Sequence, residues 1–258
     1  MDAIPISVTI LTKDSARMLR EVLEALRPFD EVLIADNGSS DATLEIAREF
    51  PNVKIHRTEF KGFGPLHNEA AELARNDWIF SVDSDEVLTP ELVAELRAMG
   101  LDENCVYSVA SKNFYNGKWI RRGGWYPDRK LRLYNRKRTR FSDAQVHESV
   151  LTEGLCVAEL QNPMNHFSYT CVADFITKTQ RYSELFAQEN RGRKKSSVSK
   201  AVSHGTAAFL KSYVLKRGFL DGREGFVICA YQGMVAYYKY LKLLEANEKG
   251  QGRLQTKQ

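Results

Sequence analysis

The first hundred residues alternate between short apolar runs and segments whose apolar residues recur at helical spacing. Helical spacing is seen at Leu19, Val22 and Leu26 and again in Pro65–Ala74. The short runs predict strands that are covered on both faces, at Ile6–Leu11, Glu31–Asp36, Val53–His56 and Trp78–Asp83. This order of strand and helix predicts a parallel, doubly wound sheet, whose ligands bind beyond the carboxyl ends of its strands.

Polar residues mark where the predicted helices begin. We expect Asp41 to cap a helix that carries Leu44 and Ala47, and Thr89-Pro90-Glu91 to open another. After about a hundred residues the regularity fades, and residues 112–140 have the composition of a loop-rich insertion. Strand-like pieces are Cys105–Ser111, Lys130–Tyr134 and Leu155–Leu160, and helical spacing returns from Asp174 onward.

The sequence does not predict a secretion signal or a membrane span. Met1-Asp2-Ala3 carries no positive charge, and the apolar run that follows is interrupted by polar residues. The longest uncharged stretch of the C-terminal third, Gly225–Tyr238, has 14 residues, whereas a spanning helix needs about 20. The four cysteines include no Cys-x-x-Cys pair, which favours neither a zinc site nor a disulfide framework and indicates a cytoplasmic protein.

Charge is unevenly distributed along the chain of 258 residues, although its total is only +4. Residues 1–111 sum to −11, 112–140 to +10, 141–174 to −5 and 175–258 to +10. The composition excludes disordered, collagenous and disulfide-framework proteins, and a uniformly basic nucleic-acid binder would not be built this way. The alternation suggests separate zones for ligands of different charge.

Three carboxylates follow the fourth predicted strand, in Val82-Asp83-Ser84-Asp85-Glu86. Acids at a strand end can simply cap the turn, and a lone Asp-x-Asp leaves that interpretation open. In a parallel sheet, however, this edge is where ligands bind. One carboxylate can hold a hard divalent cation, Mg²⁺ or Mn²⁺, while the other binds a sugar or ribose hydroxyl.

A second strand end carries Asp36-Asn37-Gly38-Ser39-Ser40-Asp41. Its structural interpretation is a tight turn, with Gly38 at positive φ and Asp41 as a helix cap. We expect that this turn does not need Asp36. The carboxylate of Asp36 can accept the N–H of a uracil ring, which cytosine lacks, so the pattern favours a uridine nucleotide.

These strand ends resemble the inverting family 2 glycosyltransferases, which have the GT-A fold. The resemblance covers residues 4–100 and rests on Thr12-Lys13-Asp14, Asp36-Asn37-Gly38-Ser39-Ser40-Asp41, Gly62-Phe63-Gly64 and Val82-Asp83-Ser84-Asp85. Later segments look like the bacterial branch that includes the lipopolysaccharide inner-core β-1,4-glucosyltransferases. These segments are Gly123-Gly124-Trp125-Tyr126-Pro127-Asp128-Arg129, Val146-His147-Glu148 and Asn165-His166-Phe167.

The resemblance implies a role for each matching residue. Asp85 would hold Mg²⁺ or Mn²⁺ at the donor diphosphate, and His166 would join that metal. A histidine satisfied within the core is the alternative for His166. A divalent cation that is bound by a neutral imidazole neutralises the negative charge of the departing UDP, so the reaction needs no proton donor. The residues implied to bind the UDP-sugar donor are Thr12, Asp14, Asp36, Gly62 and Asp83.

Inverting transfer needs one general base, which takes the proton of the acceptor hydroxyl as its oxygen attacks the sugar. Glu148 is our candidate, because it lies in a segment without Lys or Arg that would depress its pKa. Asp128 is the second candidate, and its neighbours Arg129 and Lys130 should weaken it as a base. The motif Val146-His147-Glu148 departs from the commoner Glu-Asp form of the family, so both candidate bases remain open.

The two basic blocks suggest an acceptor site and a membrane contact. Residues 112–140 combine eleven cations with aromatic side chains, which fits an acidic glycolipid acceptor better than a solvated face. RNA is a further possible ligand, but no RNA-binding motif accompanies the block. In residues 209–242, mixed aromatic and basic residues fit either helix packing or docking on an anionic membrane surface.

The sequence therefore predicts an α/β protein with a GT-A, Rossmann-like, mostly parallel sheet flanked by helices and a helical C-terminal extension. The expected domains are residues 1–172, with a nucleotide-sugar half (1–111) and an acceptor and metal half (112–172), and residues 173–258. The expected function is transfer of a hexose, glucose from UDP-glucose, onto a heptose of the lipopolysaccharide inner core. We expect a peripheral enzyme at the cytoplasmic face of the inner membrane, without a nucleic-acid partner and of undetermined oligomeric state.

Two other protein classes compete for the same residues. Asp83 and Asp85 also fit the nucleophile motif of haloacid-dehalogenase phosphatases. That motif should lie near the N-terminus and precede a late acidic pair, but the chain has no Asp-Asp dipeptide. A non-catalytic membrane- or RNA-binding module accounts for the basic blocks but not for the acids at the strand ends.

Overall fold

The computed structural model describes residues 2–144 and 148–250, which divide into two compact units. The first, here the sheet unit, comprises residues 1–112 and 128–166. The second, here the helical unit, comprises residues 113–127 and 167–258. Residues 113–127, which were expected with the catalytic domain, thus belong with the C-terminal helices.

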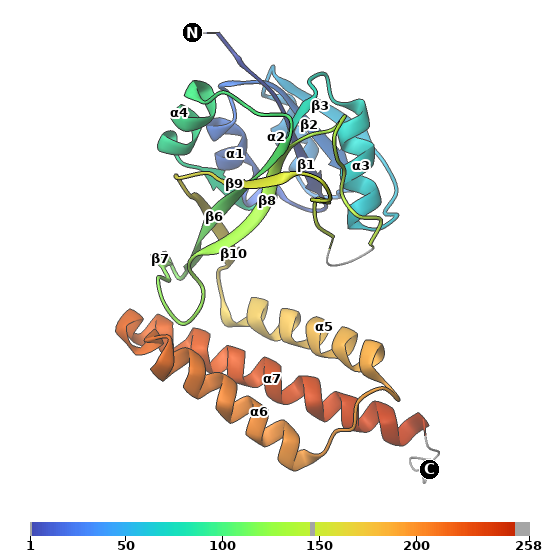
Figure 1. The fold of residues 1–258 in the computed structure, drawn as a ribbon, viewed down its shortest axis with the longest axis vertical. Coiled ribbons are helices and arrows are strands. Elements are labelled where there is room, and N and C mark those ends of the chain that lie inside the picture. Colours follow the sequence, from blue (N-terminus) through green and yellow to red (C-terminus); the bar gives the residue numbers. More distant parts are fainter. Residues whose placement is uncertain (1, 145–147, 251–258) are drawn as a thin grey trace. The chain divides into compact units, whose positions relative to one another are not determined.

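The sheet has the order β3-β2-β1-β4-β8-β6-β10-β5, with β7 and β9 paired to β6 (Figure 1). The first four strands of this order are parallel, whereas β8 is antiparallel to both β4 and β6. The described strands are β1 Ile4–Thr12, β2 Phe29–Asp36, β3 Val53–Arg57, β4 Trp78–Ser81, β5 Glu86–Leu88, β6 Cys105–Tyr115, β7 Lys118–Trp119, β8 Asp128–Asn135, β9 Cys156–Glu159 and β10 Met164–Tyr169. The expected α/β fold is confirmed, with a mixed sheet.

The central strands β1 and β2 are buried on both faces of the sheet along most of their length. Val8 and Ile10 of β1 pack with Val32 and Ile34 of β2 in one core. The flanking helices are α1 Ala16–Ala25, α2 Thr43–Arg48, α3 Phe63–Leu73 and α4 Pro90–Ala98. Each strand is therefore held in place by apolar burial, and its polar carboxyl end extends beyond that core.

Polar side chains stabilise the starts of both helices for which the sequence predicted a cap. Thr89 caps α4, because its hydroxyl accepts the N–H of Leu92 at 3.2 Å. Asp41 stands one residue before the N-cap of α2, and its carboxylate accepts the N–H groups of Thr43 and Ala16, each at 3.0 Å. Asp41 thus stabilises the starts of two helices at once.

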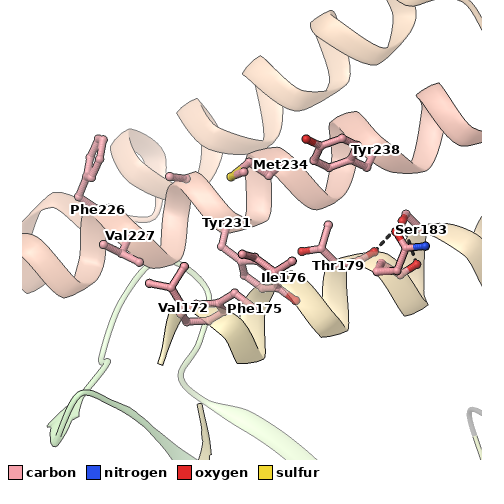
Figure 2. Close-up of a pocket in the computed structure, with 12 residues that line it drawn as sticks. Val172, Phe175, Ile176, Thr179, Ser183, Phe226, Val227, Tyr231, Met234 and Tyr238 are labelled. Atoms are coloured by element: carbon pink, nitrogen blue, oxygen red, sulfur yellow. Dashed lines mark hydrogen bonds between the residues drawn. The ribbon is translucent and has the colours of Figure 1, made fainter. Parts of the chain in front are cut away.

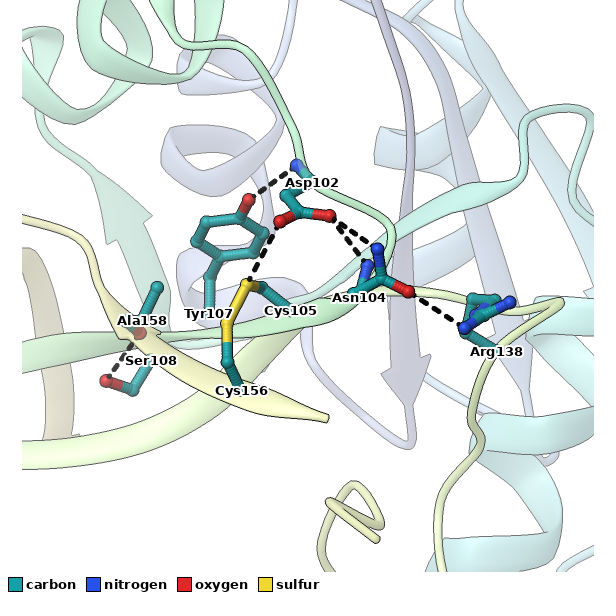
Figure 3. The surroundings of a disulfide bond; sticks show 8 residues. All are labelled: Asp102, Asn104, Cys105, Tyr107, Ser108, Arg138, Cys156 and Ala158. Carbon is teal, nitrogen blue, oxygen red and sulfur yellow. Dashed lines mark hydrogen bonds between the residues drawn. A yellow bond between two sulfur atoms is a disulfide. The ribbon is translucent and has the colours of Figure 1, made fainter. Parts of the chain in front are cut away.

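A disulfide joins Cys105, at the start of β6, to Cys156, at the start of β9 (Figure 3). The two strands are parallel neighbours, and these cysteines are partners in their register. The preceding turn is held by the N–H of Asp102, which donates to the Tyr107 hydroxyl at 2.7 Å. The sequence did not indicate this pairing, and such bonds are rare in the cytosol, so the expected location does not account for it.

The helical unit contains three long helices and the short hairpin that β7 forms with the end of β6. Its helices are α5 Val172–Asn190, α6 Val198–Leu210 and α7 Gly222–Gly250, and a π turn (Lys211–Leu215) and a 3₁₀ turn (Gly218–Asp221) join the last two. Helices α6 and α7 approach closely, because a Cβ on Gly205 would lie 3.1 Å from the Gly233 carbonyl oxygen. None of the described helices is both long and apolar enough to cross a membrane.

Candidate functional site

Thr12 and Asp36 end two adjacent strands, β1 and β2, at the same register position. The Thr12 hydroxyl donates to the Asp36 carboxylate at 2.9 Å, and the N–H groups of Gly38 and Ser39 donate to it at 3.1 and 3.0 Å. The Ser39 hydroxyl also donates to this carboxylate. Burial alone would raise the pKa of Asp36, but these hydrogen bonds together lower it.

The turn after β2 therefore depends on Asp36, and the expectation that it does not need this residue is wrong. Asp36 is only 1% exposed, and both of its oxygens accept hydrogen bonds from within the chain. Gly38 has the predicted positive φ, at 95°. A contact between Asp36 and uracil stays a prediction. To accept the uracil N–H, the Asp36 carboxylate would have to give up one of these internal hydrogen bonds.

Asp14 lies in an exposed loop that is joined to the Asp36 turn. Its carboxylate accepts the N–H of Ser40 at 2.7 Å, and its own N–H donates to the Ser39 hydroxyl at 3.0 Å. The hydrogen bond from the Ser40 N–H is the largest cause that lowers the pKa of Asp14. The two loops thus form one edge, on which Asp14 is the more accessible carboxylate.

Asp83, after β4, forms an ion pair with Arg132 of β8. One Arg132 nitrogen, Nη2, lies 2.5 Å from Asp83 and 2.7 Å from Glu86, which is fully buried. Lys130, two residues earlier on the same strand, lies 3.8 Å from both carboxylates. Burial would raise the pKa of Asp83, but Arg132 and Lys130 hold it far below its usual range.

The sequence reasoning missed the roles of Arg132 and Glu86. A signal was present, because Lys130 and Arg132 alternate along a predicted strand and must share one face. Which carboxylates they would meet depends on β8 lying beside β4, an antiparallel pairing between distant segments. The pairing places two cations beside the acids that end β4.

Asp85 and His166 are brought together at the same end of the sheet. The His166 Nε2 lies 3.5 Å from the Asp85 Oδ1, and one ligand atom each from Asp83, Asp85 and His166 lie within 4.8 Å of one another. His166 is on β10, where it faces Glu86 of β5 in an antiparallel register. Two carboxylates and an imidazole suit Mn²⁺ or Mg²⁺, so the donor set fits the expected metal.

Glu148 is half-buried in the segment between β8 and β9. Val146 and His147 of its motif lie outside the described residues. Phe141 and Val150 form a bridge at the base of this segment, and the Ser142 N–H donates to the Ser149 carbonyl at 2.9 Å. Asp128, the second candidate base, begins β8 opposite Ser111 of β6.

Helix α3 holds the start of the Glu148 segment through its first two turns. The Asn68 side chain bonds both backbone groups of Phe141, at 2.9 and 3.0 Å, and the Gly64 N–H donates to the Ala144 carbonyl at 3.1 Å. A Cβ on Gly64 would lie 1.9 Å from the Ser142 carbonyl oxygen, so only glycine allows this contact. Gly62, the N-cap of α3, has a φ of 108°. In the structure these glycines shape the helix start, and donor binding by Gly62 stays a prediction.

His67 should make the stability of the chain depend on pH. Its imidazole is buried beside Phe141, with ring centroids 4.2 Å apart, and burial lowers its pKa to about 4. As the pH falls from 7 to 5, the unfolded chain gains a proton that the folded chain cannot accept. The free energy of unfolding should therefore fall by about 2 kcal/mol from this group. Urea unfolding at both pH values should show a smaller fall in His67→Gln, and an unchanged fall would contradict the assignment.

Replacing Arg132 by methionine should destabilise the sheet unit strongly. The change leaves Glu86, and part of Asp83, as buried charges without their main partner, which should cost about 3–5 kcal/mol. Arg129→Met is the matched control, because Arg129 lies on the same strand but pairs with the exposed Glu159. That change should cost about 1 kcal/mol or less. Equal midpoints of urea unfolding for the two variants would refute the role of Arg132.

Comparison with known families matches residues 7–155 to the family described as "Glycosyl transferase family 2". The match spans more than half of the chain and includes the ends of β1, β2 and β4, but not His166 of β10. The chain belongs to glycosyl transferase family 2. The resemblance stated from the strand-end motifs is thereby confirmed, and the phosphatase is no longer needed to explain Asp83 and Asp85.

Two curated relatives align with nearly the whole of this glycosyltransferase. An uncharacterised glycosyltransferase of Rickettsia prowazekii is 27% identical over 261 residues, covering 95% of this chain and 89% of the relative. The lipopolysaccharide core biosynthesis glycosyltransferase LpsC of Rhizobium meliloti is 25% identical over 256 residues, covering 94% and 93%. The match therefore extends beyond the family region into the helical unit.

A solved structure of the same fold is the mannosyltransferase PcManGT of Pyrobaculum calidifontis, in complex with GDP-Man and Mn²⁺. It superposes with a TM-score of 0.56 at 12% identity, covering 93% of this chain and 87% of that one. At this identity the likeness concerns the fold alone. It agrees with the GT-A fold that the order of motifs predicted.

Proposed function

We propose that this enzyme transfers a hexose, glucose from UDP-glucose, onto a heptose of the lipopolysaccharide inner core with inversion at the anomeric carbon. The observation that carries the proposal is the meeting of Asp85 and His166 at the carboxyl edge of the sheet. The similarity to LpsC over 93% of its length supports the lipopolysaccharide acceptor. Glucose, heptose and the linkage follow from the resemblance of the later motifs.

The donor would lie along the edge formed by the ends of β1, β2 and β4. Thr12, Asp14 and Asp36 are its proposed uridine contacts, and Asp83 its proposed ribose or sugar contact. Asp14 is exposed, and the hydrogen bond from the Ser40 N–H lowers its pKa and so favours the charged carboxylate. The fold itself also accommodates a guanosine donor, as in PcManGT, so the choice of base rests on these loops.

Glu148 would accept the proton of the acceptor hydroxyl while its oxygen attacks the anomeric carbon opposite the diphosphate. Asp85 and His166 would hold the metal, with Asp83 nearby but occupied by Arg132. Mg²⁺ or Mn²⁺, when bound, supplies positive charge for the departing diphosphate. Lys130 and Arg132 add fixed positive charge to the same strand end. Asp128 is the alternative base.

The acceptor is proposed to be an acidic glycolipid presented at the cytoplasmic face of the inner membrane. Exposed cations of residues 112–140, such as Arg121, and the basic helical unit provide the complementary charge. Aromatic side chains such as Trp119 and Tyr126 pack together in the same block, at 5.1 Å between ring centroids. Both rings are half-buried, and sugars commonly stack on the open faces of such rings.

A donor panel tests the proposal directly. UDP-glucose with Mn²⁺ or Mg²⁺ should raise the unfolding temperature, because a bound donor stabilises the folded state. The enzyme should also hydrolyse UDP-glucose slowly in the absence of an acceptor. UDP-N-acetylglucosamine, UDP-galactose and GDP-mannose should do so less or not at all. Selective stabilisation by a GDP-sugar, or by no donor in the presence of metal, would overturn the UDP assignment.

A further inference from the structure

The helical unit contains an apolar groove between α5 and α7, with a volume of about 550 Å³. Figure 2 shows its lining, with Phe226 and Val227 at one end and Ser183 and Tyr238 at the other. From Phe226 to Tyr238 the groove follows α7 for about 18 Å, at 1.5 Å per residue. A second hollow of about 410 Å³, between α6 and α7, shares Ala230, Met234 and Tyr238 with it.

The lining is mostly apolar, and its polar side-chain atoms are confined to Thr179, Gln180, Ser183, Tyr231 and Tyr238. The Ser183 hydroxyl donates to the carbonyls of Thr179 and Gln180 in its own helix, at 2.6 and 3.1 Å. Large apolar side chains remain open to solvent, with Ile176 63% exposed and Met234 51% exposed. Exposed apolar side chains that gather along a groove mark a binding surface, and this lining suits a hydrocarbon.

One end of the groove continues into the turns that join α6 to α7, here called the tip (residues 210–223). Phe226 contacts Tyr213, and Tyr213 contacts Phe219, with ring centroids 5.7 and 6.1 Å apart. The tip exposes Leu210, Val214, Leu215, Phe219 and Leu220 to solvent. Large apolar side chains therefore extend from the groove onto the surface of the tip.

Positive charge accompanies these apolar residues. The tip carries Lys211, Lys216, Arg217 and Arg223. Of the two acids near them, Asp221 pairs with Arg122 at 3.6 Å, and Glu224 pairs with Lys118 at 3.5 Å and with Arg223 of the tip at 3.3 Å. No such acid pairs with Lys211, Lys216 or Arg217 among the ion pairs of the described residues. Exposed apolar side chains flanked by cations are typical of a segment that enters the headgroup layer of an anionic membrane.

We propose that the groove between α5 and α7 binds a fatty acyl chain of an anionic membrane lipid, whose phosphate pairs with the cations of the tip. A hydrocarbon chain matches the apolar lining of the groove, and an anionic headgroup matches the positive charge of the tip. A second copy of the chain would bring two basic surfaces together, and their repulsion would oppose association. The proposal deepens the membrane part of the proposed function and does not require sugar transfer.

Photolabelling of the full chain tests the site. The probe is phosphatidylglycerol with a diazirine in the middle of one acyl chain, diluted into phosphatidylcholine vesicles. Mass spectrometry should find adducts on 172–183 of α5 and 226–238 of α7. Adducts confined to the tip, or none, would overturn the proposal. Glycerophosphoglycerol, the headgroup without chains, should not compete, and competition by it would overturn the acyl assignment.

Matched variants separate the groove from general surface hydrophobicity. Ile176→Asn with Met234→Asn should weaken vesicle binding by about tenfold and remove adducts from the groove. Val198→Asn and Val157→Asn change residues of similar exposure, 56% and 55%, outside the groove, and should leave binding within about twofold. Equal losses in both sets would refute the site. Circular dichroism should show that each variant keeps its helices.

Two further readouts exclude the remaining explanations. Ala230→Phe fills the shared wall of both hollows without removing apolar surface, so it should block groove adducts while vesicle flotation persists. Sedimentation without lipid should give a monomer, and a dimer that Ile176→Asn dissociates would assign the groove to a second copy instead. Labelling needs neither donor nor acceptor, so its failure leaves the donor panel intact, and failure of the panel leaves the labelling result intact.

Discussion

Asp85→Asn should lower sugar transfer by about 10³-fold or more, because it removes the charged oxygen ligand of the proposed metal site. The change keeps the size of the side chain, so the fold should be unaffected. His166→Ala should act on the same step, and the double variant should be little worse than either single one, since both remove the same ion. Turnover measured against Mn²⁺ concentration, with UDP-glucose as donor, checks this.

Asp77→Asn is the matched control for Asp85. Asp77 precedes β4 at its amino end, away from the ligand edge, and it is half-buried, with ion pairs to the half-buried Arg136 and the exposed Lys137. Its loss should leave turnover within about twofold and reduce stability by about 1 kcal/mol at most. If Asp85→Asn instead behaved like this control, with unchanged metal dependence, the metal assignment would be untenable.

Glu148→Gln should slow transfer by about 10²–10⁴-fold while leaving donor binding unchanged. The amide keeps the shape of the side chain but cannot accept the proton of the acceptor hydroxyl. Donor binding, measured as thermal stabilisation by UDP-glucose, should be unaffected, because the proposed base acts on the acceptor hydroxyl and not on the donor. In this variant the rate of transfer should therefore fall while thermal stabilisation by the donor is kept. If the variant merely unfolded, both would be lost.

Asp128→Asn decides between the two candidate bases. Glu148 is our first candidate for the base, so the loss of the Asp128 carboxylate should slow transfer by less than about tenfold. A collapse of the rate in Asp128→Asn, with Glu148→Gln active, would transfer the role to Asp128. Because Gly64 and Asn68 position the Glu148 segment, Asn68→Ala should slow transfer in the same direction as Glu148→Gln.

The family and the parallel half of the sheet could be predicted from the sequence because their signals are local. Apolar runs that are buried on both faces show themselves within a few residues, and so do the caps at Thr89 and Asp41. The motifs after β1, β2 and β4 are also contiguous in sequence. Parallel neighbouring strands then bring them to one edge by topology alone, without any detail of side-chain packing.

What the sequence could not provide were the partners of these acids. Arg132 meets Asp83 only because β8 pairs with β4, across 49 residues of chain. Asp36 was expected to be free for a ligand, yet its turn consumes both oxygens. The Cys105–Cys156 disulfide likewise depends on β9 lying parallel to β6, a register that no local pattern states.

The sequence by itself determined the order of the four parallel strands and the helices between them, the acids that end these strands, and membership of glycosyl transferase family 2. Only the tertiary structure decided which distant residues meet: Asp85 with His166, Arg132 with two carboxylates, and α5 with α7 around an apolar groove. The physical reason is that hydrophobic periodicity and capping act over a few residues. Ion pairs, metal ligands and grooves instead arise where chain segments far apart in sequence are packed together, and their free energy depends on that packing.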